Sequence, residues 1–309
     1  MNFEFLILLF SLLSVVSSQK LTEEENEMRK KTCGINLNRK VMNGVRAKIT
    51  EAPWNVAIEV MNGVPGLCTG TLISPRHVIT ARHCFANLNG DQYKWITKPE
   101  QDVPGCDNGE EDIVLEQNFD DMFKVYIGTD CGYRKHCDER KNFTEIGIHK
   151  VVLPKTCDDR TLDFDDFAIV ELSKNVEFSK RVQPICVADN ETQLLGSDSL
   201  TRLYGYGLDP TRGENSAGPL RYETVKAVKC EYLDAAKTFC TKSVSGRQLA
   251  CMGDSGAGVV RKVKGRVTLL GVIFQGAECK PSVRNEKDHI ANVVHYSEDI
   301  CKYTGVCSK

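Results

Sequence analysis

The sequence predicts an all-β fold, because its apolar stretches are short, turn clusters separate them, and helical periodicity is scarce. Trp54, Val56, Ile58 and Val60 lie at alternate positions, as a half-buried strand requires. Apolar stretches at 71–73, 77–80 and 267–273 predict further strands. The best helical pattern lies near the end of the chain, over 297–303.

The first 18 residues contain an apolar run that starts at Phe5 and ends before Ser17 and Ser18. This pattern predicts a signal peptide over 1–18. The run is shorter than the roughly 20 residues that a membrane-spanning helix needs. We therefore expect a secreted, extracellular protein without a membrane span.

Fourteen cysteines behind a signal peptide predict disulfides. The sequence has no Cys-x-x-Cys or His-x-x-x-His pair, so no metal site is expected.

Asn142 and Asn190 begin Asn-x-Thr glycosylation acceptors. The net charge of −2 argues against nucleic acid as a partner. Gly205-Tyr206-Gly207 lacks the third glycine of a dinucleotide fingerprint, so we interpret it as a turn and expect no cofactor.

The run Gly253-Asp254-Ser255-Gly256 places a serine in a glycine-flanked turn. A serine hydroxyl becomes a useful nucleophile only with a general base and a group that orients the base. His83 follows the apolar stretch 77–80, and Asp166 precedes another apolar stretch. The order His, Asp, Ser is that of the chymotrypsin-type triad. The chain therefore resembles the trypsin/chymotrypsin family of secreted serine proteases.

This resemblance implies two antiparallel β-barrels with the active site between them and a short C-terminal helix. The expected peptidase domain covers 41–309, with a first barrel over about 41–180, a second over about 195–296, and a helix and tail over 297–309. The length of the chain after residue 40 suits such a two-part body.

The resemblance also assigns chemical roles to the three residues of the triad. Ser255 attacks a carbonyl carbon, His83 accepts the serine proton and passes it to the leaving group, and Asp166 fixes the imidazole tautomer. The backbone N–H groups of Gly253 and Ser255 would hold the oxyanion.

An activation propeptide is expected over 19–40. In the resembled family, a cut after a basic residue frees an ammonium group that pairs with the aspartate before the nucleophile. The equivalent residues are Lys40, Val41 and Asp254, and such a pair would offset the cost of burying the carboxylate. A solvated linker around Lys40 remains the alternative.

The resemblance implies four disulfides. They are Cys33–Cys186, Cys68–Cys84, Cys230–Cys240 and Cys251–Cys279. Six cysteines have no family position and no assigned pairing. These are Cys106, Cys131, Cys137, Cys157, Cys301 and Cys307.

The specificity pocket is expected to contain Leu249, Gly276 and Asp288. Leu249 stands where an aspartate would select Lys or Arg, so we predict a preference for Phe, Tyr, Leu or Met. Asp288 could instead bring a carboxylate into the pocket from the side. Phe274, Gln275 and Ala257 depart from the family pattern and predict slower catalysis.

Between His83 and Asp166 the chain is longer than the family pattern, and the segment 99–121 carries nine acidic residues and no Lys or Arg. A solvated loop and a rim that favours cationic substrates are equally good interpretations, and calcium binding is weaker.

Two functions remain open at this point. The chain is an active endopeptidase made as a zymogen, or a protease homologue that binds or regulates without useful turnover. For the first we expect a monomer that meets a polypeptide substrate, an activating protease and protein inhibitors.

Overall fold

The computed structural model describes residues 20–35, 46–61, 66–89, 92–104, 111–133, 136–137, 144–157, 166–193, 201–231, 233–246, 250–276, 279–280 and 286–308. Several predicted features lie outside these ranges: the signal peptide 1–18, Lys40, Val41, Asn142, Leu249 and Cys106. Within the described ranges, no helix is long and apolar enough to cross a membrane.

The first half of the chain forms an eight-stranded antiparallel sheet in the order β6-β9-β10-β3-β2-β1-β7-β8. Its strands are β1 (Asn55–Val60), β2 (Leu67–Leu72), β3 (His77–Thr80), β6 (Ile113–Glu116), β7 (Phe123–Ile127), β8 (Thr144–Ile146), β9 (Ile148–Leu153) and β10 (Ala168–Leu172). A hairpin of β4 (Ala86–Asn89) and β5 (Gln92–Trp95) follows the 3₁₀ turn η1 (Arg82–Cys84). In the described part of the chain no ladder joins the two edges of this sheet, so it is a curled, open half-barrel.

The second half forms a closed barrel. Its strands are β11 (Cys186–Val187), β12 (Thr201–Gly205), β13 (Arg221–Val228), β14 (Thr238–Ser243), β15 (Gly258–Val263), β16 (Arg266–Gln275) and β17 (Lys287–Asn292). Because β16 pairs with both β15 and β17, six antiparallel strands close on themselves. The short β11 joins the outside of β16 in parallel. Two 3₁₀ turns, η2 (Glu191–Gln193) and η3 (Glu214–Ser216), lie in its loops.

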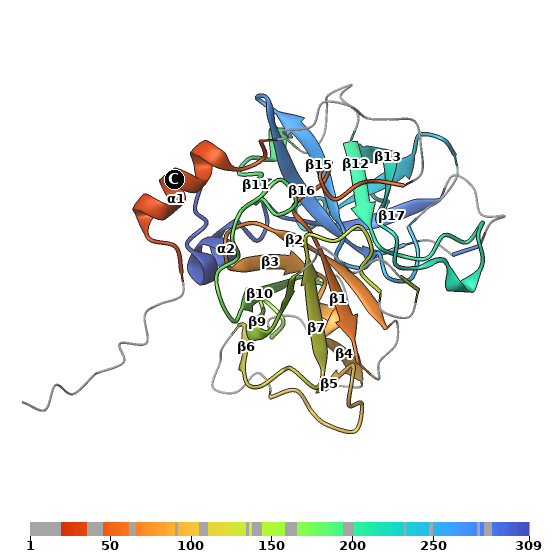
Figure 1. Ribbon diagram of the computed structural model, residues 1–309, viewed down its shortest axis with the longest axis horizontal. Coiled ribbons are helices and arrows are strands. Elements are labelled where there is room, and N and C mark those ends of the chain that lie inside the picture. The colour runs from red at the N-terminus through yellow and green to blue at the C-terminus, as the bar shows by residue number, and fades with distance from the viewer. Residues whose placement is uncertain are drawn as a thin grey trace, which may run out of the picture.

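Figure 1 shows the two sheets one above the other, with both α-helices on one side of the molecule. The all-β prediction, with two β-units and the short C-terminal helix α2 (Ser297–Thr304), is confirmed. The first sheet differs from the predicted closed barrel, because among the described residues it is an open half-barrel.

The prediction that β1 is half-buried is wrong, because all six of its residues are buried. Val56 and Ile58 belong to the hydrophobic core. On the other face, the Asn55 side-chain amide donates to the Tyr204 carbonyl oxygen of the second barrel at 3.0 Å. The second barrel therefore covers the face that the alternating pattern assigned to solvent, and β1 joins the two halves.

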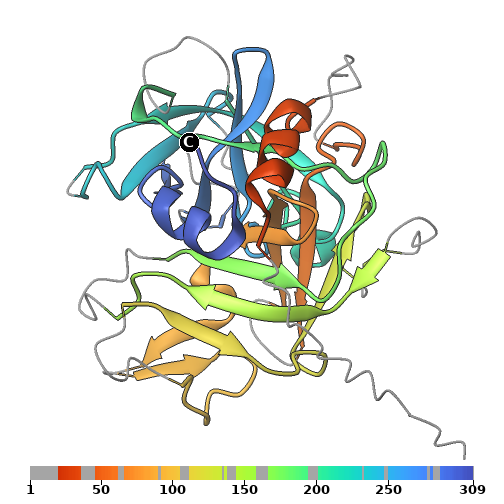
Figure 2. The same ribbon diagram turned by 90° about the vertical axis from the view of Figure 1, so that its left-hand side faces the viewer.

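The helix α1 (Glu23–Thr32) was missed by the sequence analysis, although Thr22 and Glu25 form a capping box at its start. It lies beside α2 in both views (Figures 1 and 2), and the Leu21 N–H donates to the Thr304 carbonyl oxygen at 2.9 Å. The Cys33–Cys186 disulfide then fixes the end of the segment to β11.

Disulfides also join Cys68–Cys84, Cys230–Cys240 and Cys251–Cys279. Two cysteine pairs that the resemblance left unassigned are local, each spanning six positions: Cys131–Cys137 and Cys301–Cys307. Cys157 is also disulfide-bonded.

The acidic segment 99–121 is not simply a solvated loop. Its residues 113–116 form the edge strand β6, which pairs with β9. Asp112 is buried and accepts hydrogen bonds from Lys302 Nζ at 2.7 Å and the Tyr303 hydroxyl at 2.6 Å, both on α2. Local charge composition could not reveal these partners, because α2 lies about 190 positions further along the chain.

Candidate active site

The candidate active site lies where the first sheet meets the closed barrel. Strand β3 ends in the η1 turn that carries His83, and the Cys68–Cys84 disulfide ties this turn to β2. Asp166 stands just before β10, which pairs with β3. Adjacent strands of one sheet therefore bring together two residues that are 83 positions apart.

His83 and Asp166 make two hydrogen bonds. The His83 backbone N–H donates to Asp166 Oδ1 at 3.0 Å, and His83 Nδ1 lies 2.6 Å from Asp166 Oδ2. Burial alone would raise the pKa of Asp166, but the neighbouring His83 and its hydrogen bonds hold that pKa below its ordinary value. Asp166 is therefore an anion that can orient the imidazole and stabilise its protonated form.

Ser255 completes the constellation from the closed barrel. Its Oγ lies 2.7 Å from His83 Nε2, which is hydrogen-bonding distance for proton transfer. Gly256 has φ +80°, and a Cβ there would lie 2.0 Å from Thr80 Oγ1, so only glycine fits behind the serine. The Gly256 N–H donates to the Ile273 carbonyl oxygen at 2.7 Å, which fixes the turn to β16.

Thr69 on β2 is a residue that the sequence analysis missed. Its backbone N–H donates to the Ser255 carbonyl oxygen at 2.9 Å, and its hydroxyl donates to the Gly253 carbonyl oxygen at 2.9 Å. The same hydroxyl accepts from the Tyr206 N–H at 3.1 Å. Thr69 thus holds both residues whose N–H groups would form the oxyanion site. No local pattern indicated this, because the partners lie in the other half of the chain.

The Asp254 carboxylate lies against two glycines, Gly205 and Gly207. Its Oδ1 accepts from the Gly207 N–H at 2.8 Å, and its Oδ2 accepts from the Cys251 N–H at 3.0 Å. A Cβ on Gly205 or Gly207 would lie 2.0 or 2.3 Å from the Asp254 carboxylate. The interpretation of Gly205-Tyr206-Gly207 as a simple turn is therefore incomplete, because these glycines let the carboxylate approach the backbone.

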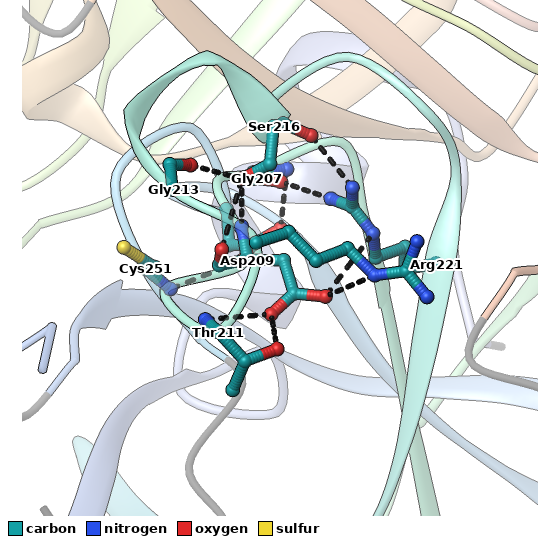
Figure 3. A network of polar contacts seen from close by, with 9 residues as sticks. Gly207, Asp209, Thr211, Gly213, Ser216, Arg221 and Cys251 are labelled. Atoms are coloured by element: carbon teal, nitrogen blue, oxygen red, sulfur yellow. Dashed lines mark hydrogen bonds and ion pairs between the residues drawn. The ribbon is translucent and has the colours of Figure 1, made fainter. Parts of the chain in front are cut away.

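Burial raises the pKa of Asp254 to about 7, even though the two N–H donors and Arg221 act to lower it. A cavity of about 20 Å³ adjoins the carboxylate. Figure 3 shows the polar network beside it, in which Arg221 donates to the Gly207 carbonyl oxygen at 2.8 Å. Buried Asp209 accepts from the Thr211 backbone and hydroxyl and lies 3.9 Å from Arg221 Nε. Arg221 therefore anchors the segment that binds Asp254, a role that the sequence analysis also missed.

Of the residues expected in the specificity pocket, Gly276 and Asp288 lie in the described ranges. Ala250 and Gly276 face each other, since a Cβ on Gly276 would lie 3.4 Å from the Ala250 carbonyl oxygen. The same Cβ would lie 3.6 Å from Asp288 Oδ1. Asp288 is only 3% exposed, and it accepts at 3.5 Å from the buried Thr241 hydroxyl. The Ala250 carbonyl oxygen and Asp288 Oδ1 therefore both lie near Gly276.

The described residues contain one group of three side chains close enough to share a metal ion, Cys230, Cys240 and His289. Its two sulfurs are joined in a disulfide, so they do not offer thiolate ligands.

The fold and the arrangement of His83, Asp166 and Ser255 are those of the trypsin-like serine proteases. The sequence matches the Nematode trypsin-6-like family over residues 3–307, and the chain belongs to that family.

The chain is also similar to serine proteases of insects. A venom serine protease of Polistes dominula is 26% identical over 290 residues, which cover 90% of this chain and 89% of that protein. CLIP domain-containing serine protease B4 of Anopheles gambiae is 23% identical over 286 residues, 86% of this chain and 72% of that protein. Serine protease grass of Drosophila melanogaster is 25% identical over 232 residues, 72% of this chain and 55% of that protein.

Proposed function

We propose that the protein is a secreted serine endopeptidase made as a zymogen. The observation that carries this proposal is the chain of hydrogen bonds from Asp166 through His83 to Ser255, with contacts of 2.6 and 2.7 Å. In the proposed reaction Ser255 Oγ attacks the peptide carbonyl carbon while its proton moves to His83 Nε2. The proton then passes to the leaving amine, and water hydrolyses the acyl-enzyme by the same route.

The oxyanion of each tetrahedral intermediate would be held by the N–H groups of Gly253 and Ser255. Thr69 supports this assignment, because it holds the carbonyl oxygens of the same two residues. Donors that are fixed before the reaction stabilise developing charge without reorganising.

Activation is proposed to follow cleavage after Lys40, which would free the Val41 ammonium group. Asp254 is a suitable acceptor for it, because the carboxylate is buried, its pKa is raised, and a small cavity adjoins it. An ammonium group there would compensate the buried anion. It would also keep the Gly253–Ser255 turn in place.

We further propose that the pocket prefers Lys or Arg before the cut bond. The expected apolar preference depended on Leu249, whereas Asp288 Oδ1 and the Ala250 carbonyl oxygen both lie near Gly276. The Asp288 carboxylate would give a Lys or Arg side chain a charged partner there, which an apolar base cannot provide.

Peptide hydrolysis by the cleaved protein tests the proposal. We expect turnover by the wild-type chain and none by Ser255→Ala. A protein that folds, is cut after Lys40 and hydrolyses no peptide would support the alternative of a binding or regulatory homologue, which Phe274, Gln275 and Ala257 would then explain.

A further inference from the structure

A cavity of about 300 Å³ lies away from the triad, between α1, β11, the turn that joins β15 to β16, and the end of the chain after α2. Figures 1 and 2 both show α1 next to these elements. The cavity is therefore formed jointly by the predicted propeptide segment and the peptidase body.

Arg29 of α1 lines this cavity and is the unusual residue within it. Arg29 is only 8% exposed. Nε donates to Asn26 Oδ1 at 3.0 Å, but Nη1 is buried and has no hydrogen-bond partner among the described residues. Burial lowers the pKa of this guanidinium to about 10. A buried cation with so few partners is costly, and an anion would relieve that cost.

The other charged residues of the lining are mainly cationic. Lys264 lies exposed in the turn between β15 and β16, and Lys30 pairs with Glu27 at 2.7 Å. Arg266 donates to the carbonyl oxygens of Cys33 and Lys31, at 2.9 and 2.6 Å.

Asp189 is the one carboxylate of the described lining, against four cations. The lining therefore carries a surplus of positive charge, and Arg29 Nη1 has no partner among the described residues. Both features favour an anion.

We propose that this cavity is a binding site for an oxyanion, a sulfate or carboxylate group, with Arg29 as its central ligand and Lys264 at its mouth. The guanidinium offers paired donors that match such a group. Because α1 remains joined to β11 by Cys33–Cys186, a bound anion would hold the propeptide helix against the body. The source of the anion is a small free ion or a sulfated polysaccharide, and these differ in how many charges they present.

The test uses the full chain with Ser255→Ala, which prevents self-digestion and leaves the cavity unchanged. Thermal unfolding is followed against sodium sulfate, with sodium chloride at matched ionic strength. Binding of a sulfated oligosaccharide and of its desulfated counterpart is measured by calorimetry. Arg29→Met removes the charge and keeps the length of the side chain. Lys124→Met is the matched control, because Lys124 pairs with Glu145 far from the cavity.

We expect saturable stabilisation by sulfate that Lys124→Met retains and that Arg29→Met weakens at least tenfold in apparent Kd. Without added anion, Arg29→Met should unfold at the same temperature as the parent or higher, because the burial of an uncompensated charge is removed. Binding of the free ion alone would identify a small anion, and much tighter binding of the oligosaccharide would identify a polysaccharide. If Arg29→Met does not fold, Lys264→Met should weaken binding several-fold. The proposal is overturned if neither probe binds, or if these variants bind as the parent does.

Discussion

At the scale of single residues, the site depends on contacts between parts of the chain that are far apart in sequence. The sequence motifs pointed to His83, Asp166 and Ser255, because each stands in a short recognisable run. Thr69 belongs to no sequence motif. Only the structure shows its role, because its hydroxyl donates to the Gly253 carbonyl oxygen and accepts from the Tyr206 N–H. Residues that act directly in the chemistry were thus easier to predict than those that hold them.

Thr69→Val should lower kcat by about tenfold with little change in KM, because one oxyanion donor would lose part of its support. The substitution keeps the shape of the side chain and removes the hydroxyl. Thr69→Ser should retain nearly full kcat, and steady-state kinetics with one peptide substrate measures all three proteins. A loss in Thr69→Ser equal to that in Thr69→Val would mean that the hydroxyl has no positioning role.

Asp288→Asn should reduce kcat/KM for a peptide with Arg before the cut bond by about 100-fold or more, because a buried cation would lose its carboxylate. A matched peptide with Phe should change little. Glu145→Gln, which removes an exposed carboxylate from the first sheet, is the control and should leave both values unchanged. A wild-type enzyme that prefers Phe would restore the apolar prediction made from Leu249.

At the scale of elements, the strands were predictable and their surroundings were not. Alternation identified β1, but not that the closed barrel buries its second face. The same holds for 99–121, where composition indicated a charged segment and could not show that β6 forms or that Asp112 reaches α2. The helix α1 carried a capping box but little apolar periodicity, so no strong helical signal marked it.

Asp112→Asn should destabilise the fold by about 2 kcal/mol at pH 7, because charge-assisted hydrogen bonds from Lys302 and Tyr303 are weakened. Although burial acts to raise it, these partners hold the pKa of Asp112 below its ordinary value. The contribution is therefore present above the ordinary carboxyl pKa and is lost as the pH falls through the lowered value.

Denaturant unfolding at pH 7 and pH 3 measures this effect. The exposed Asp102, which pairs with Lys94, is the control, and Asp102→Asn should change stability by less than about 0.5 kcal/mol. Equal losses for the two variants would contradict the anchoring role of Asp112.

At the scale of the whole molecule, Asp254 connects the predicted propeptide cleavage to the catalytic turn. Its pKa of about 7 lies above the ordinary carboxyl value, so its contribution to stability is complete at low pH and is lost as the pH rises toward 7. An ammonium group beside it would remove that loss.

Lys40→Gln should give a secreted protein that folds and remains inactive. A second comparison uses the uncleaved and the cleaved protein, each with Ser255→Ala. Between pH 4.5 and 7.5 the free energy of unfolding of the uncleaved protein should fall by on the order of a few kcal/mol relative to that of the cleaved protein. Denaturant unfolding of the two forms across this range measures the difference. Full activity of Lys40→Gln would contradict the zymogen proposal, and parallel stability profiles would contradict the pairing of Val41 with Asp254.

The most direct measurement of the central claim is the reaction of the cleaved protein with a fluorophosphonate, read as a mass adduct on the peptide that contains Ser255. Only a serine activated by its base reacts readily with this reagent. We predict stoichiometric labelling of Ser255 in the wild-type protein, a large loss of labelling rate in His83→Ala, and none in Ser255→Ala. An unlabelled Ser255 in a folded, cleaved protein would contradict the account, because the contacts among Asp166, His83 and Ser255 would then not produce a nucleophile.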